Sequence, residues 1–197
     1  MHYPDHLLKL IDVFKKLPGV GSKSAERFAF HLLDWPEGKL REMGNTIENT
    51  KLFLNYCTEC NCLIEQGCTF CDNPDRNCSV VCVVASHKDV FSIEQTHEFR
   101  GLYHVLGSLL SPLQGLSPAP QAIEKLKERV LKLGVKEIIL ALDSTLEGDA
   151  TALFLKKELE EFNVVASRLA LGLPMGSSLD FIDGGTLARA LAGRHIY

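Results

Sequence analysis

The sequence predicts an α/β protein of several modules: a helical N-terminal part, a four-cysteine ribbon, and a mainly parallel βαβ sheet domain with a C-terminal helical segment. Three observations support this prediction. Apolar residues recur at helical spacing over the first 55 residues, four cysteines form two Cys-x2-Cys pairs, and apolar β-branched runs alternate with helical patterns from Ser79 onward. At 197 residues, 46% hydrophobic and 23% charged, the chain is long enough for one sizeable core with smaller attached modules.

The N-terminal part is expected to hold three helices. The apolar residues of the first helix are Leu7, Leu10, Ile11, Phe14 and Leu17. Pro18 and Gly19 should end it, and Ser22 should cap a second helix that runs to about Asp34. The apolar face of that second helix comprises Ala25, Phe28, Ala29 and Leu32. A third helix is indicated by Leu40, Met43, Ile47 and Leu54.

Four strands are expected in the second half, at residues 80–84, 102–106, 137–142 and 164–169. Two helical stripes lie between them, and they comprise Ile123, Leu126, Val130 and Leu131, then Ala152, Leu155, Leu159 and Phe162. Gly134 should end the first of these helices. The segment from Ser111 to Pro120, with three prolines and one glycine, predicts a surface loop.

The cysteine spacing predicts one structural zinc ion. Cys57 and Cys60 form one Cys-x2-Cys pair, and Cys68 and Cys71 form the next after seven intervening residues. Four thiolates complete a tetrahedral zinc shell and leave no position for a catalytic water. The alternative is a set of unliganded thiols. Of the remaining cysteines, Cys62 and Cys78 could compete as ligands, but they belong to no such pair and have no assigned role. Cys82 is expected to be a small buried residue on a central strand.

The segment LPGVGSKSAERF resembles the helix-hairpin-helix motif of DNA-binding proteins. Gly19 and Gly21 carry no Cβ and can take positive φ, so backbone N–H groups at the following helix N-terminus can approach a phosphate. Lys23 and Arg27 stand four residues apart and so share a helix face. These four residues are therefore expected to bind the DNA backbone without reading its sequence. The alternative is an ordinary helix-helix turn with solvated basic side chains.

An acidic loop, DSTLEGDAT, follows the expected strand at 137–142 and carries Asp143, Glu147 and Asp149. It resembles the Toprim domain of topoisomerases and primases, whose enzymatic members have a glutamate after the first strand and an acidic-x-acidic pair after a later one. Here Ala85 and Thr145 stand where two of those carboxylates are expected. A Mg²⁺ site therefore lacks ligands, and the remaining acids are as well explained as helix caps that face solvent.

Composition limits the classes of function. The formal net charge of −4 argues against a protein that coats nucleic acid through bulk positive charge, so any DNA contact must be local. The longest apolar run, Val80 to Ala85, is too short to span a membrane, and the beginning of the chain offers no export signal. A cytoplasmic, nucleoid-associated protein is expected. The seven histidines are scattered and predict no general base.

Taken in order, the hairpin, the cysteine pairs, CVVA, LEGDAT and LDFIDGGTLARALAGR closely resemble the RecR family of bacterial recombination mediators over essentially the whole chain. The resemblance implies a non-enzymatic protein that forms ring-like oligomers around DNA and works with RecO and RecF to load RecA at single-stranded gaps. It assigns the zinc ligands to the four paired cysteines, the DNA contacts to Lys23 and Arg27, and partner binding to Asp143, Glu147 and Asp149. The family commonly keeps an acid where this chain has Ala85.

Four modules are therefore expected. They are a DNA-binding helical domain at 1–55, a zinc finger at 56–78, a Toprim-like domain at 79–172 and a segment at 173–197 that contributes to contacts between subunits. The leading hypothesis is a DNA-repair scaffold. Its alternatives are a Mg²⁺-dependent DNA-processing enzyme of the Toprim class and a zinc-stabilised module that binds only proteins.

Overall fold

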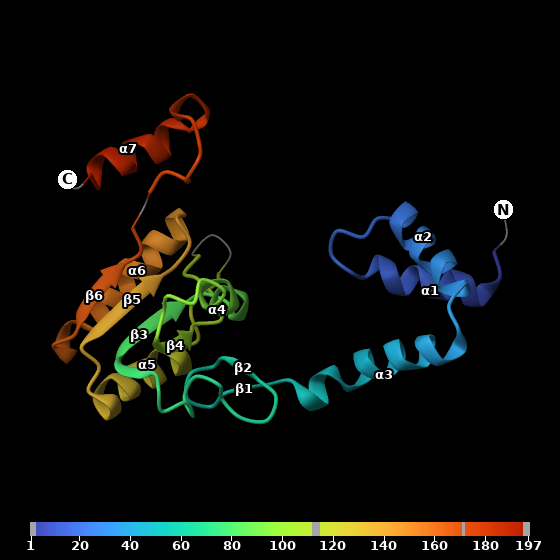
Figure 1. Cartoon of the computed structure of the whole chain (residues 1–197), viewed down its shortest axis with the longest axis horizontal. Helices are drawn as coiled ribbons and strands as arrows, with labels where there is room; N and C mark the ends of the chain where they lie inside the picture. The colour runs from blue at the N-terminus through green and yellow to red at the C-terminus, as the bar shows by residue number, and fades with distance from the viewer. Residues whose placement is uncertain (1–2, 112–114, 171, 195–197) are drawn as a thin grey trace. The chain divides into compact units, whose positions relative to one another are not determined.

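A computed structural model of the chain describes residues 3–111, 115–170 and 172–194. The chain divides into two compact units, Met1–Phe53 and Leu54–Tyr197 (Figure 1). The smaller unit is entirely helical in its described residues, and the larger one contains every described strand. Among the described helices, none combines the length and the apolar character needed to cross a lipid bilayer.

The smaller unit consists of α1 (Asp5–Lys15), α2 (Ser22–Leu33) and α3 (Glu37–Phe53). Helices α1 and α2 pack through Leu7 and Ile11 on one side and Ala25 and Ala29 on the other. Both alanines are fully buried, because their small side chains let the two helix backbones come close together. Three predicted helices are thus present, and Gly19 lies after α1 with φ of +79°.

Two local expectations in this unit were wrong. Ser22 is the first residue of α2 and not its cap, since Gly21 takes the cap position and accepts a hydrogen bond from the Ala25 N–H at 2.9 Å. Leu54 lies beyond the end of α3, and none of the residues of α3 is buried. The apolar residues that predicted this helix therefore do not pack into the core of the described unit.

The larger unit contains a four-stranded parallel sheet in the order β4-β3-β5-β6. Its strands are β3 (Asn77–Val84), β4 (Gly101–Val105), β5 (Glu137–Ala141) and β6 (Val165–Arg168). The connecting and following helices are α4 (His87–Glu94), α5 (Pro120–Leu133), α6 (Leu146–Glu158), the short η2 (Glu160–Phe162) and η3 (Leu179–Phe181), and α7 (Gly184–Ala192). A two-stranded antiparallel ribbon, β1 (Asn55–Tyr56) and β2 (Leu63–Ile64), precedes the sheet.

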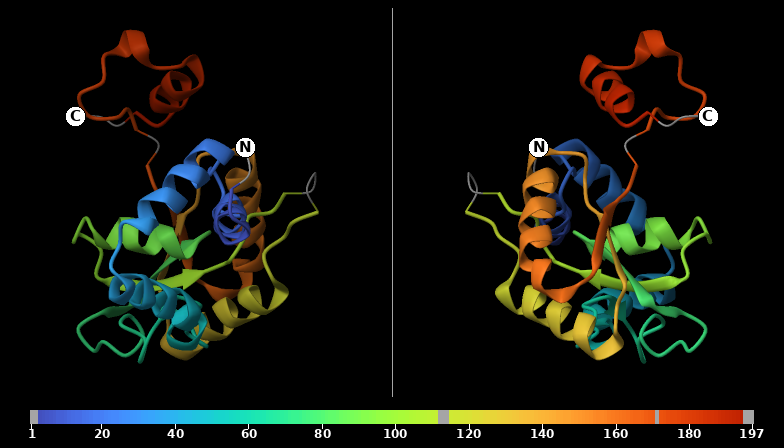
Figure 2. Two further views of the ribbon diagram at one scale, coloured as in Figure 1. Left: turned by 90° about the vertical axis from the view of Figure 1, so that its right-hand side faces the viewer. Right: turned by 90° about the vertical axis from the view of Figure 1, so that its left-hand side faces the viewer.

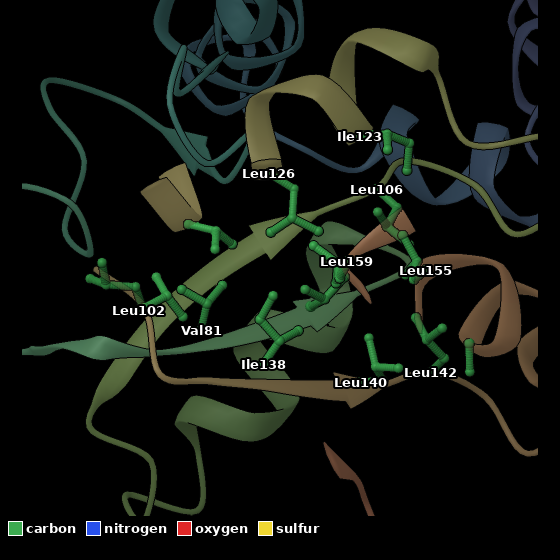
Figure 3. Packing of buried hydrophobic residues seen from close by; sticks show 14 residues of the cluster. Val81, Leu102, Leu106, Ile123, Leu126, Ile138, Leu140, Leu142, Leu155 and Leu159 are labelled. Carbon is green, nitrogen blue, oxygen red and sulfur yellow. The ribbon is translucent and has the colours of Figure 1, made fainter. Parts of the chain in front are cut away.

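Side chains alternate between the two faces of the sheet, as a β-strand requires. Val81 and Val83 of β3 join a cluster with α5 and α6 on one face, whereas Cys82 and Val84 join α4 and the cysteine ribbon on the other. Figure 2 shows α5 and α6 on one side of the sheet and α4 on the opposite side. Figure 3 shows the first cluster, in which Leu126 and Leu155 meet the strands. Both faces are covered, which explains why the strands read as continuous apolar runs.

The four predicted strands are confirmed within three residues at each end, but two details of the segments between them differ. Pro120 begins α5 instead of ending a loop, because its fixed φ suits the first helical position. Leu131 of the predicted stripe is 70% exposed. The loop itself has Ser111 and Leu116 bonded to each other at 2.8 and 3.0 Å, while 112–114 lie outside the described residues.

Helix α4 was not predicted. It is short, and its sequence signal is a capping box in which Ser86 and Asp89 exchange hydrogen bonds at the helix N-terminus. Val90 is its one buried residue.

Candidate functional site

The four paired cysteines converge on one point. The Sγ atoms of Cys57, Cys60, Cys68 and Cys71 all lie within 4.8 Å of one another, and those of Cys60 and Cys68 are 3.4 Å apart. Metal–sulfur bonds of about 2.3 Å in a tetrahedron place sulfurs about 3.8 Å apart. The cluster therefore fits one tetrahedral ion with four sulfur ligands. Within the described part of the chain, no other group of three or more His, Cys, Asp or Glu residues converges in this way.

The first pair is held by a tight turn that docks on the sheet. The Cys57 N–H donates to the Cys62 carbonyl at 2.8 Å, and the Asn61 N–H donates to Cys57 at 2.9 Å. Asn61 takes φ of +59°, which asparagine tolerates better than most residues. The Val105 N–H of β4 donates to the Cys60 carbonyl, and the Asn61 amide donates to the Val105 carbonyl at 3.0 Å. The turn is thus fixed to an edge strand.

The second pair is built around Asp72. The Cys68 N–H donates to the Asp72 carboxylate at 2.8 Å, and the Cys71 N–H points at the Cys68 sulfur at 3.3 Å. The pKa of the Cys71 thiol is raised by its hydrogen bond to Cys60 and by burial, while the Arg129 charge opposes that rise. All seven cysteines are free thiols, so no disulfide competes for these sulfurs.

A charged network joins the second pair to the sheet. The Arg76 guanidinium lies 4.8 Å from the ring centroid of Phe70, donates to the Gly101 carbonyl at 2.8 Å and pairs with Glu94 at 2.5 Å. Tyr103 also donates to Glu94, at 2.7 Å. Burial opposes ionisation of Glu94, but the hydrogen bonds from Arg76 and Tyr103 outweigh it, so the pKa of this carboxyl lies below its ordinary value. Sequence reasoning did not identify this network.

The three remaining cysteines differ in environment. Cys82 is 2% exposed on the central strand β3, as expected, and burial raises its pKa to about 12. Cys62 is buried beside the cluster, whereas Cys78 is exposed at the beginning of β3.

The hairpin presents its candidate residues on the surface of the smaller unit. Gly19 takes positive φ, but Gly21 is extended at φ of −80°, so the expectation of positive φ was correct only for Gly19. No atom lies within 4 Å of the position that a Cβ would take at Gly21. No side chain caps α2 in the described hairpin, so its first N–H groups remain available. Lys23 and Arg27 are both exposed on α2.

The acidic edge lies at the carboxyl end of β5. Asp143 is exposed, and Glu147 and Asp149 occupy the first turn of α6. The N-cap of this helix is Thr145, whose Oγ1 accepts from the Gly148 N–H at 3.1 Å. None of the three acids therefore takes the N-cap position that the alternative to a metal site gave them. Ala85 is half-buried and packs against the sheet cluster. Both residues that replace expected carboxylates therefore have structural roles.

Two arginines that sequence reasoning missed pair with one acid of this edge, Asp149. Arg168, the last residue of β6, pairs with Asp149 and donates to the Asp143 carbonyl at 3.2 Å. Arg189 of α7 pairs with Asp149 at 3.1 Å and donates to Ser144 at 2.8 Å. The hydrogen bond from Arg168, with a further contribution from Arg189, holds the pKa of the Asp149 carboxyl below its ordinary value.

Gly148 sets the close approach of α6 to the strand before it. A Cβ at this position would lie 2.0 Å from the Asp143 carbonyl oxygen, far inside van der Waals contact. The glycine of LEGDAT is therefore required by packing within the acidic edge.

Together these features define a modular α/β protein with a helical hairpin, a four-cysteine cluster and a parallel sheet domain. Family models match in the same order: "RecR, helix-hairpin-helix" at residues 7–51, "Toprim domain" at 79–170 and "RecR, C-terminal" at 172–195.

Several curated relatives carry the name Recombination protein RecR. The protein from Protochlamydia amoebophila (strain UWE25) is 60% identical over 98% of both chains. That from Chlamydia abortus is 51% identical over the full length of both, and that from Chlamydia trachomatis serovar D is 46% identical over the same extent. The chain belongs to the RecR family of recombination proteins, which supports a role in recombinational repair.

Proposed function

We propose that this protein is a non-enzymatic DNA-binding scaffold, which acts with RecO-type and RecF-type repair proteins to promote RecA loading at single-stranded gaps. The observation that carries the non-enzymatic part is the state of Asp149, which is paired with both Arg168 and Arg189. A Mg²⁺ ion that assists phosphoryl transfer needs converging oxygen ligands. Here one acid is already neutralised by guanidinium groups, and Ala85 and Thr145 supply no carboxylate.

The proposed cofactor is one structural zinc ion, held by Cys57, Cys60, Cys68 and Cys71. The convergence of the four sulfurs supports this proposal, because a shell of four thiolates is typical of structural zinc. The ion would supply no chemical step and would hold the two cysteine turns together. The turns in turn contact β4, so the ion would stabilise the ribbon against the sheet.

The proposed DNA contacts are Gly19, Gly21, Lys23 and Arg27. The uncapped N-terminus of α2 and the two exposed basic side chains on the same helix support backbone binding, because N–H donors and cations both attract phosphate. The ligand would be single-stranded or double-stranded DNA of any sequence. This proposal places the protein in the cytoplasm at the nucleoid.

The acidic loop is proposed as a partner-binding surface, but Asp149 is engaged within the chain, which leaves Asp143 and Glu147 as the accessible acids. A homo-oligomeric ring or clamp is proposed because large apolar side chains are exposed on α3 and in the C-terminal segment. They include Ile47, Leu52, Phe53, Met175, Leu179, Phe181 and Leu191. The modules are proposed to be residues 1–55, 56–78, 79–172 and 173–197.

One experiment distinguishes the scaffold hypothesis from the enzyme hypothesis. Purified protein is incubated with supercoiled and gapped DNA in Mg²⁺, and in parallel with RecO-type and RecF-type proteins, RecA and gapped DNA coated by single-strand-binding protein. The scaffold is expected to accelerate RecA filament formation and to leave the DNA intact. Mg²⁺-dependent cleavage or relaxation that Glu147→Gln abolishes would establish the enzyme instead.

The DNA contact is tested by replacing Lys23 and Arg27 with alanine together. The affinity should fall by a similar factor for all sequences. The slope of log affinity against log salt concentration should become shallower by about 0.9 per lost phosphate contact on duplex DNA. Lys39→Ala with Arg41→Ala is a matched control, because it removes the same charge from α3 of the same unit. A salt slope that Lys23→Ala with Arg27→Ala leaves unchanged from the wild type would exclude the hairpin as the contact.

A further inference from the structure

Arg129 is a buried cation without a carboxylate partner. It lies on α5, is 3% exposed, and takes part in none of the ion pairs formed between described residues. Its guanidinium donates to the Tyr103 carbonyl at 2.8 Å and approaches Nδ1 of His104 at 3.3 Å. A buried charge is costly unless an opposite charge compensates it.

His104 does not provide that compensation. Its Nε2 lies 2.9 Å from the Ala122 carbonyl, so this nitrogen carries the proton and Nδ1 accepts from Arg129. Burial and the Arg129 charge lower the pKa of His104 to about 4, so the ring is neutral. The histidine orients the guanidinium but supplies no negative charge.

The remaining contact of Arg129 is a cysteine sulfur. Its second terminal nitrogen, Nη2, lies 3.7 Å from the Cys71 sulfur, while Nη1 is held by the protein. A thiol is a weak acceptor, but a metal-bound thiolate is a charged one. Four thiolates around Zn²⁺ carry a net charge of about −2, so the loaded cluster would place an anion next to this buried cation.

We propose that Arg129 is an outer-shell positioning residue of the zinc site, which donates an N–H···S hydrogen bond to Cys71 and balances part of the thiolate charge. This inference rests on the proposed zinc. The planar guanidinium fits because one nitrogen is anchored at Tyr103 and His104 while the other reaches the sulfur. Loss of such outer-shell partners typically weakens metal binding by 10-fold to 100-fold.

The test uses full-length protein with Arg129 replaced by methionine or lysine. Zinc per chain is first measured in the wild type, and a value near zero would refute the zinc site itself. The rate of zinc transfer to a colorimetric chelator is then compared among the variants. Arg129→Met should release zinc about 10-fold or more faster than the wild type. The release rate of Arg129→Lys should lie between those of Arg129→Met and the wild type, since lysine keeps the charge but lacks the planar guanidinium with its two donor nitrogens.

Two control variants separate the effect of the lost charge on zinc release from the effect of weakened packing. Lys132→Met removes a cation from the same helix. The Lys132 side chain pairs with Glu59 and makes no hydrogen bond to a cysteine sulfur among the described residues. Val130→Ala cuts a buried side chain next to Arg129 and weakens packing without changing charge. Both should release zinc at nearly the wild-type rate. Val130→Ala releasing zinc as fast as Arg129→Met would overturn the proposal.

The Co²⁺-substituted proteins give a readout that a purely structural role would not move. Sulfur-to-cobalt charge-transfer bands respond to hydrogen bonding at the sulfurs, so Arg129→Lys and Arg129→Met should shift them while Val130→Ala should not. Identical bands in wild type and Arg129→Lys, together with equal release rates, would refute the role even if Arg129→Met fails to fold.

Discussion

The larger unit contains two clusters of groups that can carry negative charge, the cysteine cluster and the acidic edge. Arginine side chains contact the two clusters in different ways. At the cysteine cluster, Arg129 approaches one sulfur from outside and leaves the centre of the four sulfurs free. At the acidic edge, Arg168 and Arg189 bind Asp149 itself. In the first cluster three of the four cysteines are buried and Cys71 is half-buried. In the second, Asp143 is exposed and the other two acids are half-buried.

The difference shows how position decides what a guanidinium does. An arginine beside a closed set of four sulfurs can support a bound ion, because the sulfurs still face one another. An arginine bonded to a carboxylate oxygen occupies the direction from which a cation would approach. The same residue type therefore favours a metal at one site and disfavours it at the other. Four expected outcomes test this contrast, from the largest effect to the smallest.

Replacement of Cys57 and Cys60 by serine together should reduce zinc from about one ion per chain to nearly none. Structural zinc contributes on the order of 10 kcal/mol to the folding of small zinc modules, so the ribbon should unfold. Metal analysis and limited proteolysis near residue 57 measure both effects. Cys78→Ser is the control, because Cys78 is exposed and outside the cluster. Full retention of zinc in the double variant would contradict the site.

Acid should destabilise the protein through His104. Its folded pKa of about 4 lies below an unfolded value of about 6.5, because burial and then the charges of Arg129 and Lys125 disfavour the protonated ring. The stability contribution is complete above pH of about 6.5 and is lost as the pH falls toward 4. The loss should reach about 3 kcal/mol.

The free energy of unfolding in urea is measured between pH 7.5 and 4.5, with zinc in excess, for the wild type and for His104→Gln. The glutamine side chain cannot take up a proton in this range. The difference between the two proteins isolates the histidine from other acid effects. Parallel pH curves would show that His104 is not kept neutral by the fold.

Gly148→Ala should destabilise the acidic edge by about 1 to 3 kcal/mol, because the added Cβ would overlap the Asp143 carbonyl. The matched control is Gly44→Ala in α3, where no atom lies within 4 Å. That change should stabilise the helix by up to about 1 kcal/mol. Chemical denaturation of both variants gives the two signs, and a neutral Gly148→Ala would mean that the β5–α6 turn relaxes easily.

Arg189→Ala should have the smallest effect on folding, since its ion pair with Asp149 is partly exposed. The pKa of Asp149 should nevertheless rise toward its ordinary value, because one of its two cations is lost. Carboxyl titration by NMR measures that rise, with Arg194→Ala as the control from the same segment. An unmoved titration would mean that Arg168 alone sets the pKa of Asp149.

The sequence predicted the elements whose signals are local. Apolar β-branched runs predicted all four strands of the sheet, and Gly134 ends α5 in a left-handed conformation as expected. The two Cys-x2-Cys pairs predicted that four sulfurs would meet, because each pair forms its own turn. Helix α4 was missed because eight residues give a weak periodic signal.

The missed site residues share a different cause. Arg129 reaches Cys71 across 58 positions, and Arg189 reaches Asp149 across 40. Such pairs depend on how the helices α5 and α7 pack against distant parts of the chain, and a basic residue on a helix has no local sequence pattern that identifies its partner. The roles of the predicted DNA-binding and partner-binding residues stay predictions.

The cysteine ribbon also has a consequence for how the sheet can be extended. Strand β4 is an edge strand, and three of its alternate carbonyls are occupied by side chains: Gly101 by Arg76, Tyr103 by Arg129 and Val105 by Asn61. An incoming strand would have to displace all three donors before it could pair there. Strand β6 at the opposite edge is more exposed. Any chain that extends this sheet by strand addition should therefore pair with β6. The sheet can thus be extended at one edge and not at the other.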